Sequence, residues 1–248
     1  MIDELVALSR ELGAPDNHLA ILAEGNTSAL LDEERMLVKV SGASLHDTST
    51  ESFLEVWIDA VLALLDDNPR SEAEQEAALA ACIVGGDTRL RPSVETPLHA
   101  VALRHGGARF VGHTHPTAVN AILCSRHAAD LTRALFPDQI VVCGSEPVFL
   151  PYVDPGLPLA RALRDALRAR AGAPPRTLYL QNHGLVALGR SPHEVLAITR
   201  MAAKAASILG GALAAGGATF LSEEEAAAID ARRDEHYRRA RFAERGRS

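Results

Sequence analysis

Strand-type and helix-type patterns alternate along this 248-residue chain, and this alternation most limits the folds that it can adopt. Short runs of apolar or β-branched residues between turns, typical of buried strands, occur at residues 36–40, 109–113 and 177–181. Apolar residues at helical spacing, or a capping box, predict helices over residues 2–12, 53–65, 71–85, 158–171 and 192–209, and from Ser222 onward. Strands that alternate with helices favour an α/β fold.

The domain organisation is expected to be simple. No internal repeat, low-complexity linker or change of composition divides the chain. We therefore expect a single domain over residues 1–248, in which residues 222–248 form a C-terminal helical tail.

The composition is that of an ordinary globular protein. Hydrophobic residues make up 47% of the chain and charged residues 23%, which excludes a disordered, collagenous or disulfide-scaffold chain. Because 32 acidic residues outnumber 25 basic ones, the net charge of -7 gives no general attraction to nucleic acid or to an anionic membrane. We expect neither as a main partner.

The cysteines and the N-terminal segment indicate a cytoplasmic protein. Cys82, Cys124 and Cys143 form neither a disulfide framework nor a Cys-x-x-Cys pair. The N-terminus carries acids where a secretory signal needs positive charge. The uncharged run over residues 205–222 is long enough for a membrane helix, but its two glycine pairs favour a helix end and a loop.

The string Gly112-His113-Thr114-His115-Pro116 is the most informative chemical feature. Residues two apart on a strand point to the same face, so His113 and His115 would lie side by side. His183 follows 68 positions after His115, at the end of another expected strand and before Gly184. Three neutral imidazoles leave one tetrahedral position of a zinc ion open, as in catalytic zinc sites. Because the chain holds ten histidines, ordinary surface or core histidines are the alternative interpretation of this pattern alone.

Two other catalytic classes have weaker support. The His-Glu-x-x-His motif of zinc proteases is absent, since no second histidine follows His193-Glu194 at the required spacing. Schiff-base chemistry is limited to Lys39 and Lys204, and we expect both on the surface of a strand or a helix. A lysine-dependent aldolase would have to use one of these two residues.

Glu95 is the candidate general base. Ser93 can cap a helix just before it, and Pro97 falls in the tolerant first turn of that helix. An open zinc ion beside a carboxylate combines a Lewis acid with a general base, which suits the removal of a proton from carbon beside a carbonyl. The alternative is that Glu95 only stabilises the positive end of the helix. We expect His99, one turn further on, to be packed or locally hydrogen-bonded.

Two small polar strings, Gly25-Asn26-Thr27-Ser28 and Ser41-Gly42-Ala43-Ser44, each follow an apolar run. Their backbone amides and hydroxyls could form a cradle for an anion. Neither matches a Walker loop or a dinucleotide fingerprint, so ordinary turns are the alternative for both.

Taken together and in this order, these strings resemble the class II aldolase/adducin family. The resemblance covers residues 1–210 and rests mainly on His113-Thr114-His115-Pro116 with the later Asn182-His183-Gly184. Among its members, the chain is most similar to the zinc aldolases that act on fuculose or rhamnulose 1-phosphate. The resemblance implies a three-layer α/β/α sandwich around a central, mainly antiparallel sheet, assembled as a homotetramer with active sites between subunits.

The resemblance also implies a role for each motif residue. His113, His115 and His183 would hold one zinc ion per chain and Glu95 would transfer the proton, while the substrate phosphate would be received by Asn26, Ser41, Gly42 and Ser93. The implied reaction is retro-aldol cleavage of a ketose, in the first instance a ketose 1-phosphate, through a metal-bound enediolate. An epimerase, decarboxylase or dehydratase of a sugar phosphate or sugar acid on the same site is the first alternative. A non-catalytic interaction module like the adducin head is the second, but it would not need the three histidines and Glu95.

Three departures from the fuculose-phosphate aldolases bear on this interpretation. Val94 stands where those enzymes have a second serine, which removes one hydroxyl from the phosphate site. No tyrosine occurs between His115 and Tyr152, although those enzymes use one soon after the histidine pair. Tyr237 could supply an acid from a neighbouring subunit, although packing or solvent exposure is the expected role of this side chain.

Overall fold

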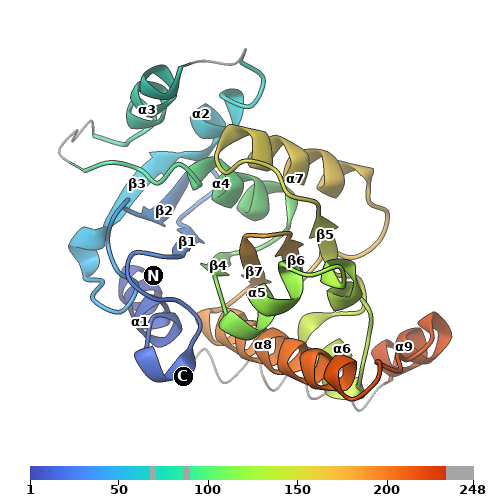
Figure 1. Ribbon diagram of the computed structural model, residues 1–248. Coiled ribbons are helices and arrows are strands. Elements are labelled where there is room, and N and C mark those ends of the chain that lie inside the picture. Colours follow the sequence, from blue (N-terminus) through green and yellow to red (C-terminus); the bar gives the residue numbers. More distant parts are fainter. Residues whose placement is uncertain (68–70, 86–89, 233–248) are drawn as a thin grey trace.

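One mixed sheet organises the described part of the chain, which comprises residues 1–67, 71–85 and 90–232 of the computed structural model. The strand order is β3-β2-β1-β4-β7-β6-β5, and neighbouring strands are antiparallel except for the parallel pair β5 and β6 (Figure 1). The strands are β1 Asn26–Leu30, β2 Arg35–Lys39, β3 Phe53–Trp57, β4 Phe110–Thr114, β5 Val148–Leu150, β6 Thr177–Leu180 and β7 Gly184–Gly189.

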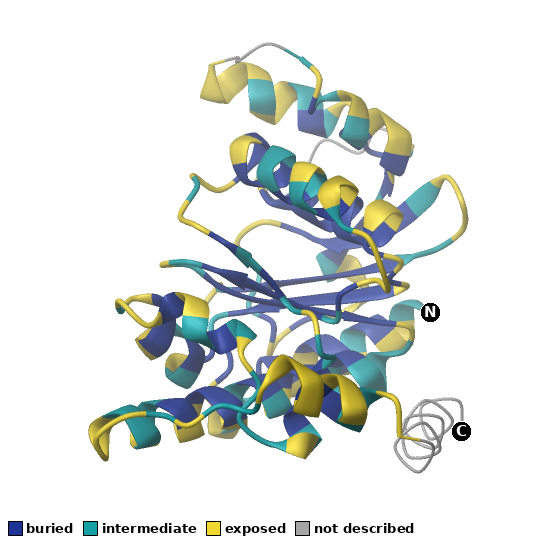
Figure 2. Ribbon diagram, turned by 90° about the vertical axis from the view of Figure 1, so that its right-hand side faces the viewer, coloured by how far each residue is buried: buried dark blue, intermediate teal, exposed yellow. Residues whose placement is uncertain are grey.

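Helices cover both faces of this sheet, as the edge-on view in Figure 2 shows. The helices on one face are α2 Ile58–Ala63, α4 Thr96–His105 and α7 Leu157–Ala169. Those on the other face are α1 Ile2–Leu12, α5 Thr117–Leu123, α6 Pro137–Cys143 and α8 Pro192–Ala214. The expected α/β sandwich around a mainly antiparallel sheet is therefore confirmed.

The two hydrophobic cores follow from the alternation of side chains along the strands. In β4, Phe110 packs into the core beneath α1 and α8, whereas Val111 packs into the core beneath α4 and α7. By the same alternation His113 points to the α4 face. This direction decides which helix can contribute to a site around the histidine.

Most of the expected elements are present. The three expected strands correspond to β2, β4 and β6, and the helices expected at residues 2–12, 158–171 and 192–209 correspond to α1, α7 and α8. Ser71 and Ser222 each form a capping box, with Glu74 and Glu225 respectively. Two short helices follow these caps, α3 Glu72–Ala80 and α9 Glu223–Asp230. The expected end of the third helix, near Gly85, is therefore wrong by one turn or more.

The helix predicted over residues 53–65 is wrong in its first half. Residues Phe53–Trp57 form the edge strand β3, which pairs along its whole length with β2, and only Ile58–Ala63 is helical. The aromatic and branched residues of this segment fit a strand as well as a helix. The unpaired edge of β2 decides between them, because pairing satisfies the backbone groups of both segments.

The polar string at residues 25–28 is not the ordinary turn that the sequence offered as an alternative, because strand β1 begins at Asn26. Strand pairing with β2 and β4 satisfies its backbone, and two buried contacts satisfy its hydroxyls. Thr27 Oγ1 lies 2.6 Å from Ser9 Oγ, and Ser28 Oγ lies 2.8 Å from His99 Nδ1. Small polar residues can therefore occupy a buried central strand here.

Helix α8 is long and apolar enough to cross a membrane by length and composition, the one such helix in the described ranges. Its apolar side has a partner in the fold, because Val195, Ile198, Ala202 and Leu209 pack in the core on the α1 face. The helix continues through Gly210 and Gly211 and ends at Ala214, so the first glycine pair does not end it as expected. We regard α8 as a core helix.

The C-terminal tail is described only in part. Helix α9 packs beside α6 and accounts for the helix expected from Ser222. The remaining tail residues, 233–248, which include Tyr237, lie outside the described residues.

Candidate metal centre

Strand pairing brings the three motif histidines to one end of the sheet. His113 lies near the end of β4, where it is the register partner of Asn26 in β1 and of Val186 in β7. His115 directly follows β4, and His183 lies in the turn from β6 into β7. The antiparallel pairing of β4 with β7 therefore places the end of one strand beside the start of the other.

The tight turn at His183 depends on the residue before it. Asn182, not Gly184, adopts the left-handed conformation, with φ of +55°. Gly184 is needed for close approach instead, because a Cβ atom there would lie 2.6 Å from His115 Cδ2 and 2.6 Å from the carbonyl oxygen of Thr114. The glycine lets the two strands meet closely enough for His115 and His183 to share a site.

The three imidazoles form a compact group. Their ring centroids are 4.8, 4.9 and 5.3 Å apart, and one ligand atom from each ring lies within 4.8 Å of the others. His113 Nδ1 lies 3.0 Å from the carbonyl oxygen of Leu185, so it donates its proton there and leaves the lone pair on Nε2. His113 Nε2 and His115 Nε2 are 3.1 Å apart. This arrangement could hold a divalent metal ion.

Glu95 completes the group from the α4 side. Its Oε1 atom lies 3.1 Å from His183 Nε2 and 3.5 Å from His113 Nε2, and the residue is only 8% exposed. Burial by itself raises the pKa of Glu95, but the attraction of His113 and His183 outweighs burial and holds the pKa well below its ordinary value. Glu95 Oε1 is buried and makes no hydrogen bond of normal geometry within the described structure. A buried carboxylate oxygen that faces several imidazole nitrogens is the donor set that a divalent cation would satisfy.

The neighbouring ring, His99, has the local role that the sequence predicted. It is fully buried, and its Nδ1 atom lies 2.8 Å from Ser28 Oγ. Burial, followed by repulsion from His113, lowers the pKa of His99 to about 3. His99 therefore stays neutral and supports the site without joining the group.

The residues expected to receive phosphate divide into two pairs. Asn26 and Ser93 are buried beside Glu95: Asn26 Nδ2 donates to Glu95 Oε2 at 2.8 Å and to Ser93 Oγ at 3.2 Å. Ser41 and Gly42 lie in an exposed loop after β2. The backbone bond from Ser41 N to the carbonyl oxygen of Arg91, 2.9 Å, holds that loop beside the segment that carries Ser93.

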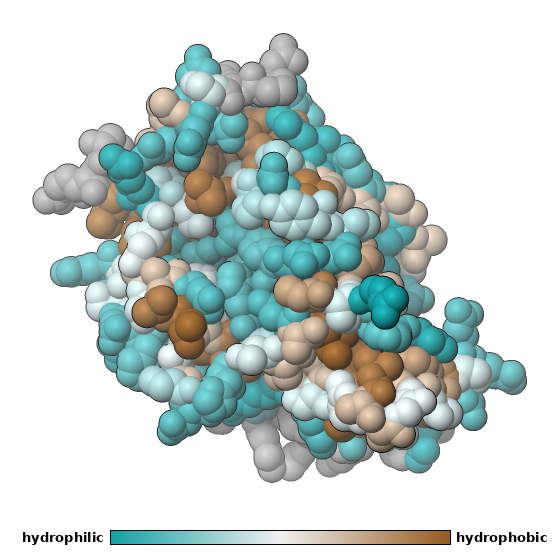
Figure 3. Space-filling view, in the orientation of Figure 1, coloured by the Kyte–Doolittle hydropathy of each residue, from teal (hydrophilic) through white to brown (hydrophobic). Residues whose placement is uncertain are grey.

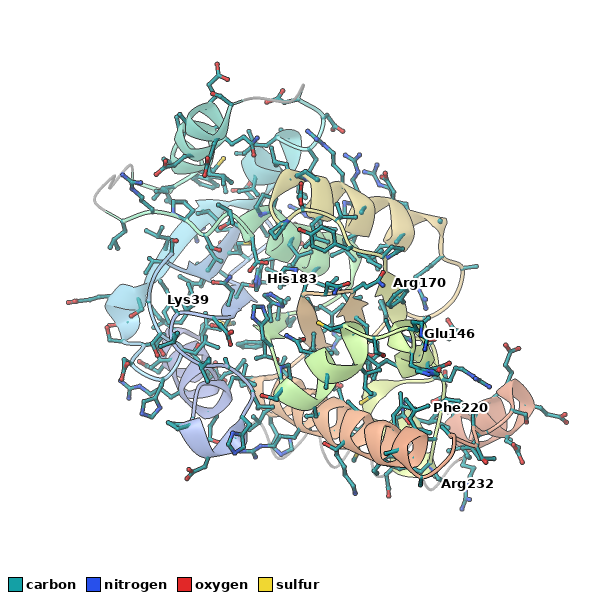
Figure 4. The ribbon with its side chains drawn as sticks, viewed as in Figure 1. Lys39, Glu146, Arg170, His183, Phe220 and Arg232 are labelled. Atoms are coloured by element: carbon teal, nitrogen blue, oxygen red, sulfur yellow. The ribbon has the colours of Figure 1, made fainter. Side chains whose placement is uncertain are left out.

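Lys39 is the clearest residue that sequence reasoning misjudged. We expected it on the surface of a strand, which is wrong, because it is 1% exposed and donates to the carbonyl oxygens of Val40 and Ala43. Burial lowers the pKa of Lys39 to about 8, and attraction to Glu95 partly opposes this shift. A lysine within the apolar run of β2 was the available signal. Figure 4 labels Lys39 and His183.

Glu24 is a second residue that the sequence did not single out. Its Oε1 atom lies 3.7 Å from His115 Nδ1, on the side of that ring away from His113. Glu24, His115, Asn120 and Cys124 line part of a cavity of about 430 Å³. In Figure 3, hydrophilic surface occupies the middle of the face that is turned to the viewer, and hydrophobic patches flank it. Space for a small ligand is therefore available next to His115.

The residues that differ from the fuculose-phosphate aldolases lie on the exposed surface or outside the described residues. Val94 is 60% exposed and adds no polar atom beside Ser93. Tyr152 is 56% exposed and donates its hydroxyl to Asp154 at 2.9 Å. Tyr237 lies outside the described residues, so its suggested role stays a prediction.

A sandwich around a mainly antiparallel sheet, with three histidines and a carboxylate gathered at the strand ends, defines a class II aldolase-like protein. The family model for the Class II Aldolase and Adducin N-terminal domain matches residues 3–209. The chain therefore belongs to this family.

Solved structures support the same fold. The N-terminal class II aldolase domain of a conserved protein from Thermoplasma acidophilum is 25% identical, with a TM-score of 0.67 over 84% of this chain and 92% of that one. YgbL from Escherichia coli, described as a candidate aldolase/epimerase/decarboxylase, is 20% identical, with a TM-score of 0.69 over 93% and 97% of the two chains. An L-fuculose 1-phosphate aldolase is 20% identical, with a TM-score of 0.70 over 92% and 93%. No curated protein matches the chain.

Proposed function

We propose that this protein is a zinc-dependent aldehyde-lyase that cleaves a carbon–carbon bond of a ketose by a retro-aldol reaction. The favoured substrate is a ketose 1-phosphate. The observation that carries the proposal is the convergence of three imidazole rings and a buried carboxylate oxygen, Glu95 Oε1, which faces two of their Nε2 atoms. An interaction module has no need of such an arrangement, whereas proton transfer beside a carbonyl requires both parts of it.

The histidines and Glu95 would have separate tasks. His113, His115 and His183 would hold the zinc ion, which when bound supplies a Lewis acid that polarises the substrate carbonyl. In cleavage, Glu95 Oε1 would accept the proton of the substrate hydroxyl whose carbon becomes the aldehyde, as the carbon–carbon bond breaks, and would then deliver that proton to the carbon beside the carbonyl of the ketone fragment. In the reverse direction, and in solvent exchange, it would remove the proton from that carbon. Because the pKa of Glu95 is lowered, this carboxylate is ionised and ready to accept a proton at neutral pH.

An anion on the substrate would bind on the β2 side of this group. Among the four residues that the family resemblance assigns to phosphate, Ser41 and Gly42 are exposed and Ser93 retains its hydroxyl proton for a ligand. Lys39 adds a buried positive charge beneath the same loop through its bonds to Val40 and Ala43. These groups support a phosphorylated substrate.

Epimerisation, decarboxylation or dehydration of a related sugar phosphate or sugar acid is the second candidate function. The same three histidines and the same base could serve these reactions, since each would begin at a carbon beside an oxygen that a Lewis acid polarises. The similarity to YgbL, described as a candidate aldolase/epimerase/decarboxylase, favours keeping this candidate.

The products that are released distinguish the lyase from the second candidate function. Purified protein with its metal content measured would be incubated with ketose 1-phosphates, free ketoses and sugar acids. Aldehyde release that depends on zinc, and that Glu95→Gln reduces strongly, is the expected result. Carbon dioxide release or an epimeric product without aldehyde would replace the lyase assignment with the second candidate.

We further propose a cytoplasmic homotetramer with one zinc ion per chain, in which residues 1–248 act as one domain without nucleic-acid or membrane partners. Ile21 and Leu22, 62% and 83% exposed, lie in the segment that leads to Glu24 and give this rim an apolar surface suited to a second copy. The free cysteines fit a reducing compartment. Light scattering should give four times the monomer mass, and a monomer at micromolar concentration would contradict the assembly.

A further inference from the structure

We propose that Glu24 is a positioning residue for His115, whose imidazole it holds with Nε2 directed at His113 and Nδ1 directed outward. The family resemblance assigns no role to Glu24. The inference rests on the metal-binding part of the proposed function and does not depend on which reaction the protein catalyses. The contacts on the two edges of one ring carry it.

The first argument concerns the partner of the outer ring nitrogen. A histidine that binds a metal through one nitrogen usually donates the proton of the other to a carbonyl or a carboxylate, which fixes the tautomer. His113 has such a partner, because its Nδ1 atom lies 3.0 Å from the carbonyl oxygen of Leu185. His115 Nδ1 faces Glu24 Oε1 at 3.7 Å, and no other described group pairs with this nitrogen. This distance is within ion-pair range but longer than a hydrogen bond, so the attraction is electrostatic.

The second argument concerns the orientation of the ring. A half-turn of an imidazole about its bond to Cβ exchanges Nδ1 with Cδ2 and Nε2 with Cε1. The Cδ2 edge of His115 faces Gly184, where a Cβ would lie 2.6 Å away, and the Nδ1 edge faces Glu24. A half-turn would present a carbon to the carboxylate and would move Nε2 from its place 3.1 Å from His113 Nε2. Because a carboxylate attracts an N–H group more strongly than a C–H group, Glu24 favours the orientation in which Nε2 faces the other histidines.

The third argument is that Glu24 is itself held in place. Its Oε2 atom accepts from the backbone nitrogen of Ile21 at 3.1 Å, and its own backbone nitrogen donates to the carbonyl oxygen of Ile21 at 3.0 Å. Leu22, inside this turn, has φ of +52°, which is rare for a bulky residue. Just before the turn, the carbonyl oxygen of Leu19 accepts from the backbone nitrogen of His115 at 2.9 Å. The segment that carries the carboxylate is therefore tied to the residue whose ring the carboxylate faces.

The exposure of Glu24 sets the size of the expected effect. Its side chain is 37% exposed, and it borders the cavity of about 430 Å³ beside His115. Solvent and salt weaken electrostatic attraction between groups that are partly exposed. Loss of a residue that supports a metal ligand lowers metal affinity by about 10–100-fold. We therefore expect an effect near the lower end of this range.

The test compares Glu24→Gln with Glu146→Gln. The first variant keeps the size of the side chain and removes the charge that faces His115. The second removes an exposed carboxylate that pairs with Arg170 at 2.8 Å and lies away from His183 in Figure 4. Each metal-free protein is titrated with Co²⁺ by visible absorption. Glu24→Gln should weaken Co²⁺ binding by about tenfold, and Glu146→Gln should bind Co²⁺ within about twofold of wild type.

A spectroscopic readout separates positioning from loose folding. The ring nitrogens of His113 and His115 are observed by NMR in ¹⁵N-labelled protein loaded with Zn²⁺. Wild type and Glu146→Gln should each show one set of signals for His115, with Nδ1 protonated. Glu24→Gln should add a second set from the turned ring of His115, whereas His113, which keeps its bond to Leu185, should be unchanged. A variant that only loosened the fold would change the signals of both histidines.

The outcomes distinguish this inference from the proposed reaction. If wild-type protein binds Co²⁺ but releases no aldehyde from any ketose, the lyase proposal fails, and the two measurements still decide the role of Glu24. Co²⁺ affinity within about twofold of wild type in Glu24→Gln would overturn the inference, whatever products are released. Equal changes at His113 and His115 would overturn it as well, because they would show a purely structural role. Wild-type protein that binds no Co²⁺ would overturn both the inference and a metal-dependent reaction.

Discussion

The histidine group (His113, His115 and His183) and the loop at Ser41 and Gly42, which we propose binds the substrate anion and call the anion loop, are both short strings in the sequence, but they are built differently in the fold. His113, His115 and His183 lie at the ends of paired strands and converge to ring centroids 4.8 to 5.3 Å apart. Ser41 and Gly42 lie in an exposed loop. The hydrogen bonds of the sheet fix the geometry of a motif on a strand, whereas the geometry of a motif on a loop depends on the residues that pack beside it.

The glycines of the two regions show the same contrast. Gly184 has no room for a Cβ, because His115 and Thr114 lie 2.6 Å from the position it would take. Gly42 has open space around it and is constrained only by its φ of +78°. The histidine group is therefore tightly packed, whereas hydrogen bonds from Ser41 N to the carbonyl oxygen of Arg91 and from Lys39 to that of Ala43 hold the anion loop.

Removal of a histidine should have the largest effect. His183→Ala deletes one of the three proposed ligands. Loss of a residue that only supports a ligand lowers metal affinity by up to about 100-fold, so loss of the ligand itself should lower Co²⁺ affinity further. Elemental analysis and Co²⁺ titration measure this effect. The matched control is His127→Ala, since His127 is exposed and pairs with Asp130 at 2.9 Å. Full metal occupancy in His183→Ala would disprove its role as a ligand.

Loss of the base should have the next largest effect. Glu95→Gln keeps the size of the side chain but removes the basic oxygen, so turnover should fall by about 10²–10⁴-fold. Solvent-deuterium exchange into the ketone fragment, followed by NMR, measures the proton step directly. Exchange at the wild-type rate with zinc still bound would mean that Glu95 has only a structural role.

The paired glycine variants sharpen the contrast between the two regions. Gly184→Ala should push His115 away from His183 and lower Co²⁺ affinity by about tenfold or more. Gly42→Ala should leave Co²⁺ affinity unchanged and cost about 1 kcal/mol in the free energy of unfolding, because its positive φ disfavours a side chain. Urea denaturation and Co²⁺ titration measure the two quantities. Equal losses of Co²⁺ affinity in both variants would remove the contrast.

The smallest expected effect concerns the charge beneath the anion loop. Burial lowers the pKa of Lys39 to about 8, so this side chain is positive below that pH and neutral above it. Sulfate is fully ionised throughout this range, so its own charge does not change, and its affinity should fall as the pH rises through about 8. Lys39→Met should lower sulfate affinity at pH 6.5 by less than about tenfold, because the buried charge acts through the loop and not by a direct hydrogen bond, and it should abolish the pH dependence.

The control for that experiment is Lys204→Met. Lys204 is exposed on α8 and lies 5.6 Å from the ring centroid of Phe136. Its removal should leave both the sulfate affinity and the pH dependence as in the wild type. An unchanged pH dependence in Lys39→Met would assign the titration to another group.

Linkage gives a second readout of the same lysine. Because its folded-state pKa is depressed below the ordinary value of 10.5, the unfolded chain binds more protons between pH 8 and 10.5. The free energy of unfolding should therefore rise with pH over this window in the wild type. In Lys39→Met this contribution should be absent.

The sequence contained enough information for most of the framework. The period-two rule placed His113 and His115 on one side of their strand, and the capping boxes at Ser71 and Ser222 marked two helix starts that the structure contains. The order of the short strings indicated the family before the fold was known, and the family model supports it. These features are local, so a short window of residues determines them.

Only the tertiary structure decided how the same residues are used. Whether residues 53–57 form a strand, whether Lys39 is buried and whether Asn26 faces Glu95 each depend on a partner far away in the sequence. The sequence determined which side chains point to the same face, because backbone geometry sets their alternation. The packing of distant segments determined which of those side chains are buried, charged or already hydrogen-bonded, because burial and partner choice are properties of the whole fold.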